Sequence, residues 1–383
     1  MKKRVAIALI AGVTACSLTG CTGTPVVYNS TCDCNEAVAE LTAVVEAQNT
    51  AIAELTEAVK AQKTVVVEAT EETEEAVDAA LKTGLAVSVN IADSTSADAE
   101  NAGNAKYDIT VAAVSVDEDG VIESCLIDSI PATVSFDTAG VITSDLAAEI
   151  LTKNELGEDY GMKLYGGAAY EWNEQAAALA EYAEGKTLEE LKNGAIDETG
   201  MAKDADLAST ATIYLGGYVS VIEAAVNQAQ DLGAKKGDEL RLATISSLGS
   251  SASADAENAG LAQLDTDITV LTLNEDVITS CYIDSVQAKI NFSAEGEITS
   301  DLTAPVQTKN QLGENYGMKL YGGSTYEWNE QAASFAEYVT GKTLEEVMGI
   351  AVSETTAPTE ADLASTVTIA VGGFQNVIEK AAK

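Results

Sequence analysis

A short segment rich in hydroxyl and carboxylate side chains occurs twice in the chain. Residues 206–212 have the sequence DLASTAT, residues 362–368 have the sequence DLASTVT, and two glycines and an expected helix follow each copy. Backbone N–H groups at a helix start bind anions, so this turn is suited to hold a phosphate group, although it can equally be a plain loop with an N-cap. The candidate binding residues are Asp206, Ser209, Thr212, Asp362, Ser365 and Thr368.

Aromatic residues gather upstream of each of these segments. Four of them lie within residues 160–172, and four more occupy the matching positions of residues 316–328. Flat side chains stack on a sugar or another flat ring, but they also anchor helices to sheets, and the sequence leaves both roles open. The candidate stacking residues are Tyr165, Trp172, Tyr321 and Trp328.

Residue types that carry out most hydrolytic chemistry are missing or isolated. The chain has no histidine, so no cysteine has the usual base beside it. Cys125 and Cys281 occupy equal positions in expected half-buried strands, where a free cysteine behaves as a small apolar residue. Cys32 and Cys34 are expected to be an exposed pair, with a redox role or an intermolecular disulfide as the alternative. We therefore predict no catalytic residue, no metal site and no hydrolase activity.

The elements that would position these residues are themselves duplicated. Residues 153–191 and 309–347 match in register at an offset of 156, and the offset becomes 157 upstream of the cysteines. Each copy of roughly 150 residues is the usual size of one domain. We expect an α+β fold with two tandem domains, 84–230 and 231–383, each with antiparallel strands followed by helices.

Within the first copy, alternating apolar and polar residues predict strands at 85–91, 107–116, 121–130, 132–136 and 141–143. Turns are expected at 117–120 and 137–140, each of which ends in glycine. A helix is expected at 168–184 and is ended by Gly185. Thr187 and Glu190 form a capping box that begins the next helix, and Thr343 and Glu346 repeat this signal.

The first 21 residues have the pattern of an export signal. Three basic residues precede an apolar run, and small residues lead to Cys21. The sequence LTGC at 18–21 resembles a bacterial lipobox, which implies a lipid on Cys21 after cleavage, with an ordinary secretory signal as the alternative. The apolar run is too short to span a bilayer. We expect a protein held by lipid on the outer side of the cytoplasmic membrane, at the cell surface.

A linker at 22–34 and a long helix at 35–83 are expected next. Apolar residues in the helix recur at a 3,4 spacing over about six heptads, which favours a coiled coil. We expect a stalk that self-associates as a homo-oligomer, and a single helix lying on its own domain is the alternative. The chain has 61 acidic and 21 basic side chains, which excludes nucleic acid as an expected partner because phosphate contacts need cations.

Taken together, the order of parts resembles the FMN-binding domain of bacterial surface flavoproteins. That family has an Asp-x-x-Ser-Gly-Ala-Thr motif before a Val-Ile-Glu-Ala helix, and this chain has 206–212 followed by VIEA at 221–224. The resemblance implies covalent FMN on Thr212 and Thr368, whereas Thr210 and Thr366 replace the glycine of the family. The predicted function is a cell-surface electron-transfer flavoprotein, and the alternative is a non-catalytic binding or structural lipoprotein that has kept the fold without flavin.

Overall fold

The computed structural model describes residues 79–383 and, before them, residues 42–43, 46–47, 50, 57 and 59–60. The chain divides into two units, 1–70 and 71–383, and each is considered by itself. Those residues of 42–60 that are described are helical and exposed. The signal 1–21, the linker 22–34, Cys21 and most of the expected stalk lie outside the described residues.

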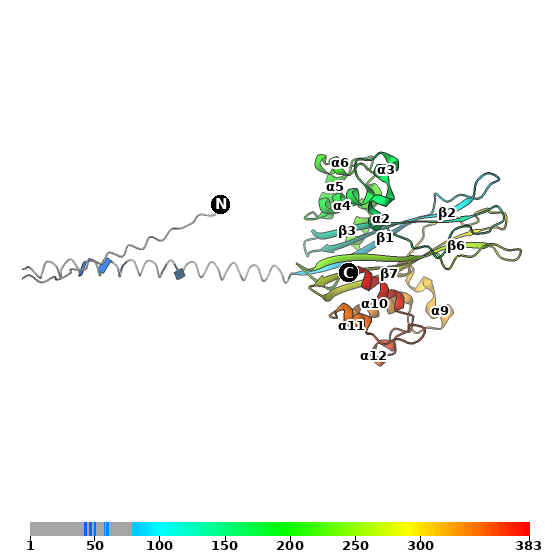
Figure 1. Cartoon of the computed structure of the whole chain (residues 1–383). Coiled ribbons are helices and arrows are strands. Elements are labelled where there is room, and N and C mark those ends of the chain that lie inside the picture. Colours follow the sequence, from blue (N-terminus) through cyan, green and yellow to red (C-terminus); the bar gives the residue numbers. More distant parts are fainter. Residues whose placement is uncertain (1–41, 44–45, 48–49, 51–56, 58, 61–78) are drawn as a thin grey trace, which may run out of the picture. The chain divides into compact units, whose positions relative to one another are not determined.

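Two antiparallel sheets form the centre of the second unit (Figure 1). The first sheet has four strands in the order β3-β2-β1-β4, and the second has three in the order β5-β6-β7. The strands are β1 (Ala80–Asn90), β2 (Gly103–Val116), β3 (Ile122–Phe136), β4 (Gln230–Lys235), β5 (Glu239–Ser247), β6 (Gly260–Asn274) and β7 (Val277–Phe292).

Helices follow the strands in each copy and cover the outer faces of the two sheets (Figure 1). The first copy contributes α2 (Lys153–Leu156), η1 (Gly157–Tyr160), α3 (Met162–Gly166), α4 (Trp172–Ala183), α5 (Leu188–Ala195), α6 (Ala205–Thr210) and α7 (Gly216–Asn227). The second copy contributes α8 (Lys309–Leu312), η2 (Gly313–Tyr316), α9 (Met318–Gly322), α10 (Trp328–Val339), α11 (Leu344–Met348), α12 (Ala361–Ala364) and α13 (Gly372–Ala382).

The local signals in the sequence place most of these elements correctly. The turn at 117–120 joins β2 to β3, and both capping boxes, at Thr187 and Thr343, begin helices. The expected strands 121–130 and 132–136 form one strand, β3, which runs through Pro131. A proline is tolerated there because β3 lies at the edge of its sheet. Residues 141–143 contribute only an isolated bridge, between Phe136 and Ile142.

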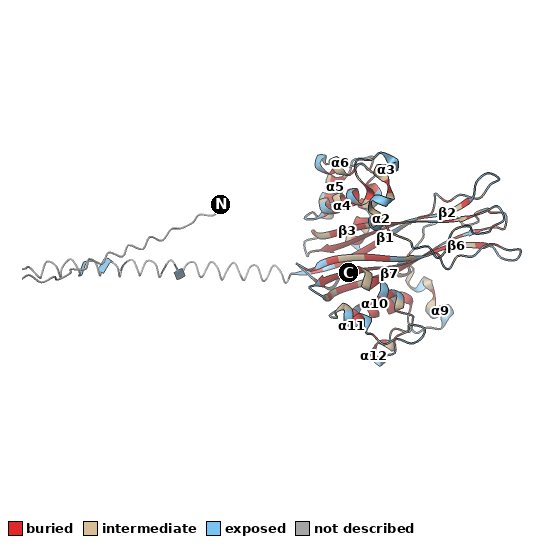
Figure 2. Ribbon diagram, in the orientation of Figure 1, coloured by how far each residue is buried: buried red, intermediate tan, exposed pale blue. Residues whose placement is uncertain are grey.

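Our expectation of two tandem α+β domains is wrong as a description of the fold, whereas the expected coiled-coil helix falls mostly outside the described residues. Residues 71–383 form one compact α+β unit in which both sheets contribute to a single central hydrophobic cluster. Each sheet has buried apolar residues on both faces: those on one face pack against the helices of its own copy, and those on the other pack against the opposite sheet. Figure 2 shows buried residues along the strands of both sheets. Alternation of apolar and polar residues along a strand shows which face is apolar. It does not show that the other copy covers the second face of the sheet.

A pair of phenylalanine rings joins the two copies at matching positions. Phe136 at the end of β3 stacks on Phe292 at the end of β7, with 4.0 Å between ring centroids and planes 3° apart. Each ring also lies over a glycine of the neighbouring strand, Gly103 or Gly260, where an added Cβ would overlap the ring. The close approach of ring and backbone therefore requires glycine at both positions.

The loops at this end of the sheets also exchange hydrogen bonds between copies. Ala97 N donates to Gly296 O and Ala254 N donates to Gly140 O, both at 2.8 Å. Strand β4 adds a further link, because it follows the helices of the first copy and pairs with β1, and the chain then enters the second sheet at β5. The two copies are thus joined by packing, by hydrogen bonds and by strand β4, which pairs in the first sheet and leads into the second.

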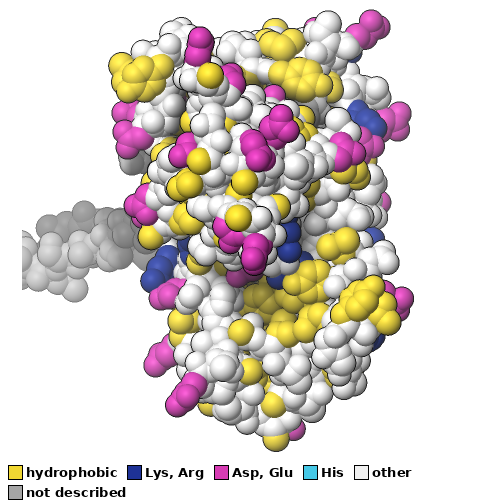
Figure 3. Space-filling model, turned by 90° about the vertical axis from the view of Figure 1, so that its right-hand side faces the viewer, with side chains coloured by type: hydrophobic (Ala, Val, Ile, Leu, Met, Phe, Trp, Pro, Cys, Tyr) yellow, Lys and Arg dark blue, Asp and Glu magenta, His cyan; other side chains and the backbone are white. Residues whose placement is uncertain are grey.

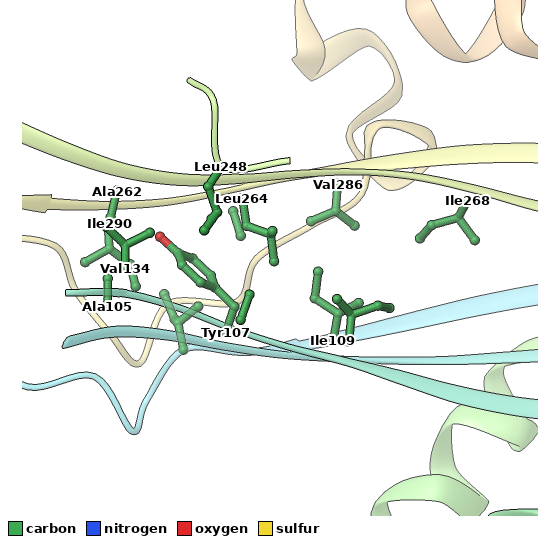
Figure 4. Packing of buried hydrophobic residues seen from close by; sticks show 14 of the residues in the cluster. Ala105, Tyr107, Ile109, Val134, Leu248, Ala262, Leu264, Ile268, Val286 and Ile290 are labelled. Carbon is green, nitrogen blue, oxygen red and sulfur yellow. The ribbon is translucent and has the colours of Figure 1, made fainter. Parts of the chain in front are cut away.

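Tyr107 is an exception in this otherwise apolar core. Its side chain projects from β2 between the sheets, and the neighbours labelled in Figure 4 are all apolar. The hydroxyl group is buried and has no hydrogen-bond partner among the described residues. The corresponding residue of the second copy is Leu264, which has no polar atom to bury.

We predict that Tyr107→Phe stabilises the protein, because the substitution removes a buried hydroxyl that makes no hydrogen bond. The expected gain in the free energy of unfolding is about 1–2 kcal/mol. Chemical denaturation of the full chain measures it, with Tyr165→Phe as the control because that side chain is 84% exposed. A loss of stability in Tyr107→Phe would show that the hydroxyl is bound to a partner.

Candidate functional site

A cleft of about 520 Å³ opens in the first copy where the strands extend beyond the layer of helices. On the outer face of β2, Ala112, Val114 and Val116 are apolar and packed under helices. Asp108 and Thr110 continue the same face and are polar, because the helices no longer cover them. The lining is completed by Ser88, Asn90, Lys153, Tyr160, Met162, Trp172, Ile213, Tyr214, Gly217, Tyr218 and Val221.

Lys153, the first residue of α2, lies at the bottom of this cleft. Its side chain is only 6% exposed, and its Nζ donates to Asp108 Oδ1 at 3.3 Å. The ammonium group lies 5.3 Å from the ring centroid of Tyr160 and 5.2 Å from that of Trp172, within the range of a cation–π contact. A buried charge of this kind requires compensation, and here a carboxylate and two aromatic rings provide it.

The electrostatics of the cleft favour the charged form of this lysine. Burial opposes the charge, but the Asp108 carboxylate and the Tyr218 and Tyr160 side chains outweigh it, so the pKa of Lys153 is raised. Asp108 also accepts a hydrogen bond from Ser129 Oγ at 2.7 Å. Lys153 and Asp108 therefore form an internally neutral pair with donors and acceptors facing the cleft.

The start of helix α2 is fixed by two carboxylates. Thr152 and Glu155 form a capping box, and the backbone N–H of Asn154 donates to Asp128 Oδ1 at 3.1 Å. The second copy repeats this arrangement with Asp284, which accepts from Asn310 N at 3.1 Å. Because the lysine is the first residue of the helix, these contacts determine where its side chain enters the cleft.

Of the two stacking residues that the sequence predicts in the first copy, one lies in the cleft. Trp172 is buried, and its Nε1 donates to the Tyr218 hydroxyl at 2.8 Å. Tyr165 is 84% exposed on α3 and packs against Gly161 instead. Trp328 and Tyr321 differ in the same way in the second copy. The tyrosine that accompanies the tryptophan is thus Tyr218, which lies in a later helix.

The residues of the predicted anion-binding turn lie in α6 and in the segment that joins α6 to α7. Thr212 is exposed, and its backbone N and Oγ1 lie 2.7 and 3.2 Å from Gln175 Oε1. Gln175 is fully buried, and its Nε2 donates to Tyr170 O. Thr368 and Gln331 repeat this geometry in the second copy. A buried glutamine therefore holds each turn in place, a role that the sequence pattern did not reveal.

The other predicted residues of the turn have structural partners. Ser209 Oγ donates to Asp206 O, and Ser365 Oγ donates to Asp362 O, so both hydroxyls bond to the backbone of their own short helix. The side chain that caps α6 is Asp204. Asp206 and Asp362 lie in the first turns of α6 and α12, where negative charge is favourable.

The corresponding region of the second copy has different chemistry. Asp267 stands at the position of Thr110 and its Oδ2 lies against Gly373 of α13. Phe374 replaces Tyr218, so Trp328 packs against a ring that has no hydroxyl. Burial lowers the pKa of Lys309 more than the nearby carboxylates raise it. The duplication thus preserved the scaffold while the chemistry of this region diverged between the two copies.

The cysteines of the described chain have no catalytic environment. Cys125 and Cys281 are free and buried, as expected. Burial raises the pKa of each thiol to about 12, so the reactive thiolate is scarce at neutral pH. Among the described residues no group of three or more potential metal ligands comes together, and no helix has the length and apolar character needed to cross a membrane.

Comparison with known proteins provides no assignment, since no family model, no curated protein and no solved structure matches the chain significantly. The sequence pattern missed Asp108, Lys153, Gln175 and Tyr218. One signal for the lysine was available: Thr152 and Glu155 bracket it as a capping box, which predicts a helix start and so places Lys153 at its first position.

We predict that Asp284 makes stability fall as pH rises from about 4 to 6. Burial raises the pKa of this carboxyl from 3.8 to about 6, so the folded state favours the protonated form. Well below pH 3.8 the group is protonated in both states. Between pH 3.8 and 6 the unfolded chain ionises while the folded chain stays mostly protonated, and the folded state loses about 2–3 kcal/mol of stability by pH 7.

Chemical denaturation at pH 4 and pH 7 measures this contribution in the full chain and in Asp284→Asn. We expect the free energy of unfolding of Asp284→Asn, relative to that of the natural protein, to be higher at pH 7 than at pH 4. An exposed carboxyl in Asp206→Asn serves as the control for the net charge of the chain. Equal pH dependence in all three proteins would contradict the effect of burial.

Proposed function

We propose that the protein is a non-catalytic ligand-binding lipoprotein of the cell surface, and that the first-copy cleft is its binding site. One observation carries this proposal. A lysine that is 6% exposed lies between two aromatic rings on a floor of polar strand residues, in a cleft of about 520 Å³. Volumes of 300–1,000 Å³ with few convergent polar groups are usual for small-molecule sites.

The cleft favours a compound with a ring and with neutral polar groups. Asp108 already neutralises Lys153, so a ligand does not need a negative charge to be accepted. The side chains of Asn90, Thr110 and Tyr218 add donors and acceptors around the pair. Hydroxyl or carbonyl groups on a sugar or on a flat heterocycle match this lining.

Export and lipid attachment through Cys21, and self-association through the 35–83 helix, remain proposals based on the sequence. They suit a binding protein, because a lipid and a stalk would hold the site away from the membrane. The excess of acidic side chains on the face shown in Figure 3 is consistent with a protein that does not bind nucleic acid.

A covalent flavoprotein is the second candidate function. Thr212 is an exposed residue whose Oγ1 lies 3.2 Å from Gln175 Oε1, and the next two residues, Ile213 and Tyr214, line the cleft. A flavin ring has the carbonyl groups that the cleft favours, and bound FMN would supply electron-transfer chemistry. Intact mass of protein taken from its native envelope tests this: one or two FMN additions support it, and an unmodified mass with no flavin released on denaturation ends it.

We predict saturable binding of a sugar or flavin in the first copy only. The two tryptophans provide separate reporters, since Trp328→Phe leaves only Trp172 and Trp172→Phe leaves only Trp328. Mono- and disaccharides are titrated by tryptophan fluorescence, and riboflavin and FMN by calorimetry. Lys153→Met is expected to weaken binding at least tenfold, which is the usual effect of losing a hydrogen bond to a charged group.

Lys309→Met is the matched control, and its affinity should equal that of the natural protein. The proposal fails if no compound in the panel binds. It also fails if only Trp328 responds, or if Lys153→Met binds as tightly as Lys309→Met while both variants show the thermal unfolding of a folded chain.

A further inference from the structure

A second cavity, of about 600 Å³, lies in the other copy at the outer edge of strand β7. One wall is formed by β4 at Gln230, Asp231 and Leu232, and the other is formed by helix α10. Strand β4 pairs with β1 and lies beside β7 without pairing with it. Gly233 of β4 lies against Thr279 O and covers that part of the β7 edge, whereas the part at Cys281 borders the cavity. The remaining lining residues are Cys281, Tyr282, Ile283, Asn310, Asn329, Ala333, Ala336, Glu337 and Thr340.

The equivalent edge of the first copy shows which backbone groups point outward. Asn154 Nδ2 donates to Ile127 O at 2.9 Å, and Cys125 N donates to Glu184 Oε1 at 3.3 Å. Alternate residues of a strand direct their backbone groups to the same side, so residues 125 and 127 both face away from the sheet. The N–H of Cys125 and the carbonyl of Ile127 are therefore both capped by side chains of the first copy.

In the second copy only one of these two caps is present. Asn310 Nδ2 donates to Ile283 O at 2.9 Å, as in the first copy. Thr340 replaces Glu184, and its Oγ1 donates to Ala336 O of its own helix at 3.0 Å. The backbone N–H of Cys281 consequently faces the cavity without the cap that Cys125 has. An open strand edge of this kind is a template for an added strand.

The cavity is also lined by polar side chains that have no partner in the described structure. The Oδ1 atom of Asn329 is buried and has no partner among the described residues; the equivalent atom of Asn173 shares this property. Asp231 and Glu337 are exposed at the rim and form no ion pair in the described structure, and the lining contains no lysine or arginine. The charge of the rim favours a cationic partner.

We propose that the β7 edge binds a short extended peptide segment that carries lysine or arginine. Its backbone would accept a hydrogen bond from the uncapped N–H of Cys281, and its basic side chains would lie near Asp231 and Glu337. This site is independent of the first-copy cleft, because the two have no lining residue in common.

The test uses the full chain, deuterated and labelled with ¹⁵N only at cysteine. The probe is the hexapeptide acetyl-Val-Lys-Val-Lys-Val-Lys-amide, with an N-methylated version that cannot pair as a strand and a version with Glu in place of Lys. We expect a saturable shift of the Cys281 amide signal and none at Cys125, whose N–H is capped. Both altered peptides should bind at least tenfold more weakly.

Thr340→Glu provides the decisive variant, because it installs the cap that the first copy has. It should weaken binding of the lysine peptide at least tenfold even though it adds negative charge, whereas Thr340→Ser should leave affinity unchanged. An unaltered Cys125 signal shows that each variant is folded. The proposal is overturned if Cys281 does not respond at millimolar peptide, if the N-methylated or glutamate peptide binds equally well, or if Thr340→Glu retains full affinity.

Discussion

The burial of each sheet against the other is the constraint on which the rest of this structure depends. The helices of each copy cover the outer face of its own sheet, so the apolar inner face is buried only by the sheet of the other copy. The stacked rings of Phe136 and Phe292 and the glycines beneath them fix the close approach of the two copies. Removal of apolar surface from water is the main driving force for this arrangement.

This arrangement also explains where binding sites can form. Strands supported from inside by the opposite sheet can extend past their own helices, and the uncovered part of β2 becomes the polar floor of the cleft. The two copies then differ in the residues that line the cleft and the cavity. Tyr218 and Thr110 keep polar groups in the first cleft, whereas Thr340 leaves the second edge uncapped. Duplication therefore gave one scaffold with two chemically different surfaces.

Local features of the fold could be predicted from the sequence because their causes are local. Capping boxes, glycine turns and alternating strands depend on neighbouring residues, and most of them are found where they were expected, although residues 141–143 form only an isolated bridge. The shared core could not be predicted, because alternation shows that a face is apolar but not what covers it. Long-range partners such as Lys153 with Asp108, or Trp172 with Tyr218, depend on that arrangement, so only Trp172 was recognised among these four.

Thermal unfolding of the separated copies tests the shared core most directly. The full chain, residues 79–229 and residues 230–383 are heated while near-UV circular dichroism and sedimentation are recorded. A shared core predicts one cooperative transition for residues 79–383 of the full chain and no cooperative transition for either fragment as a monomer. A monomeric fragment 79–229 that melts cooperatively at the temperature of the full chain would contradict the shared core.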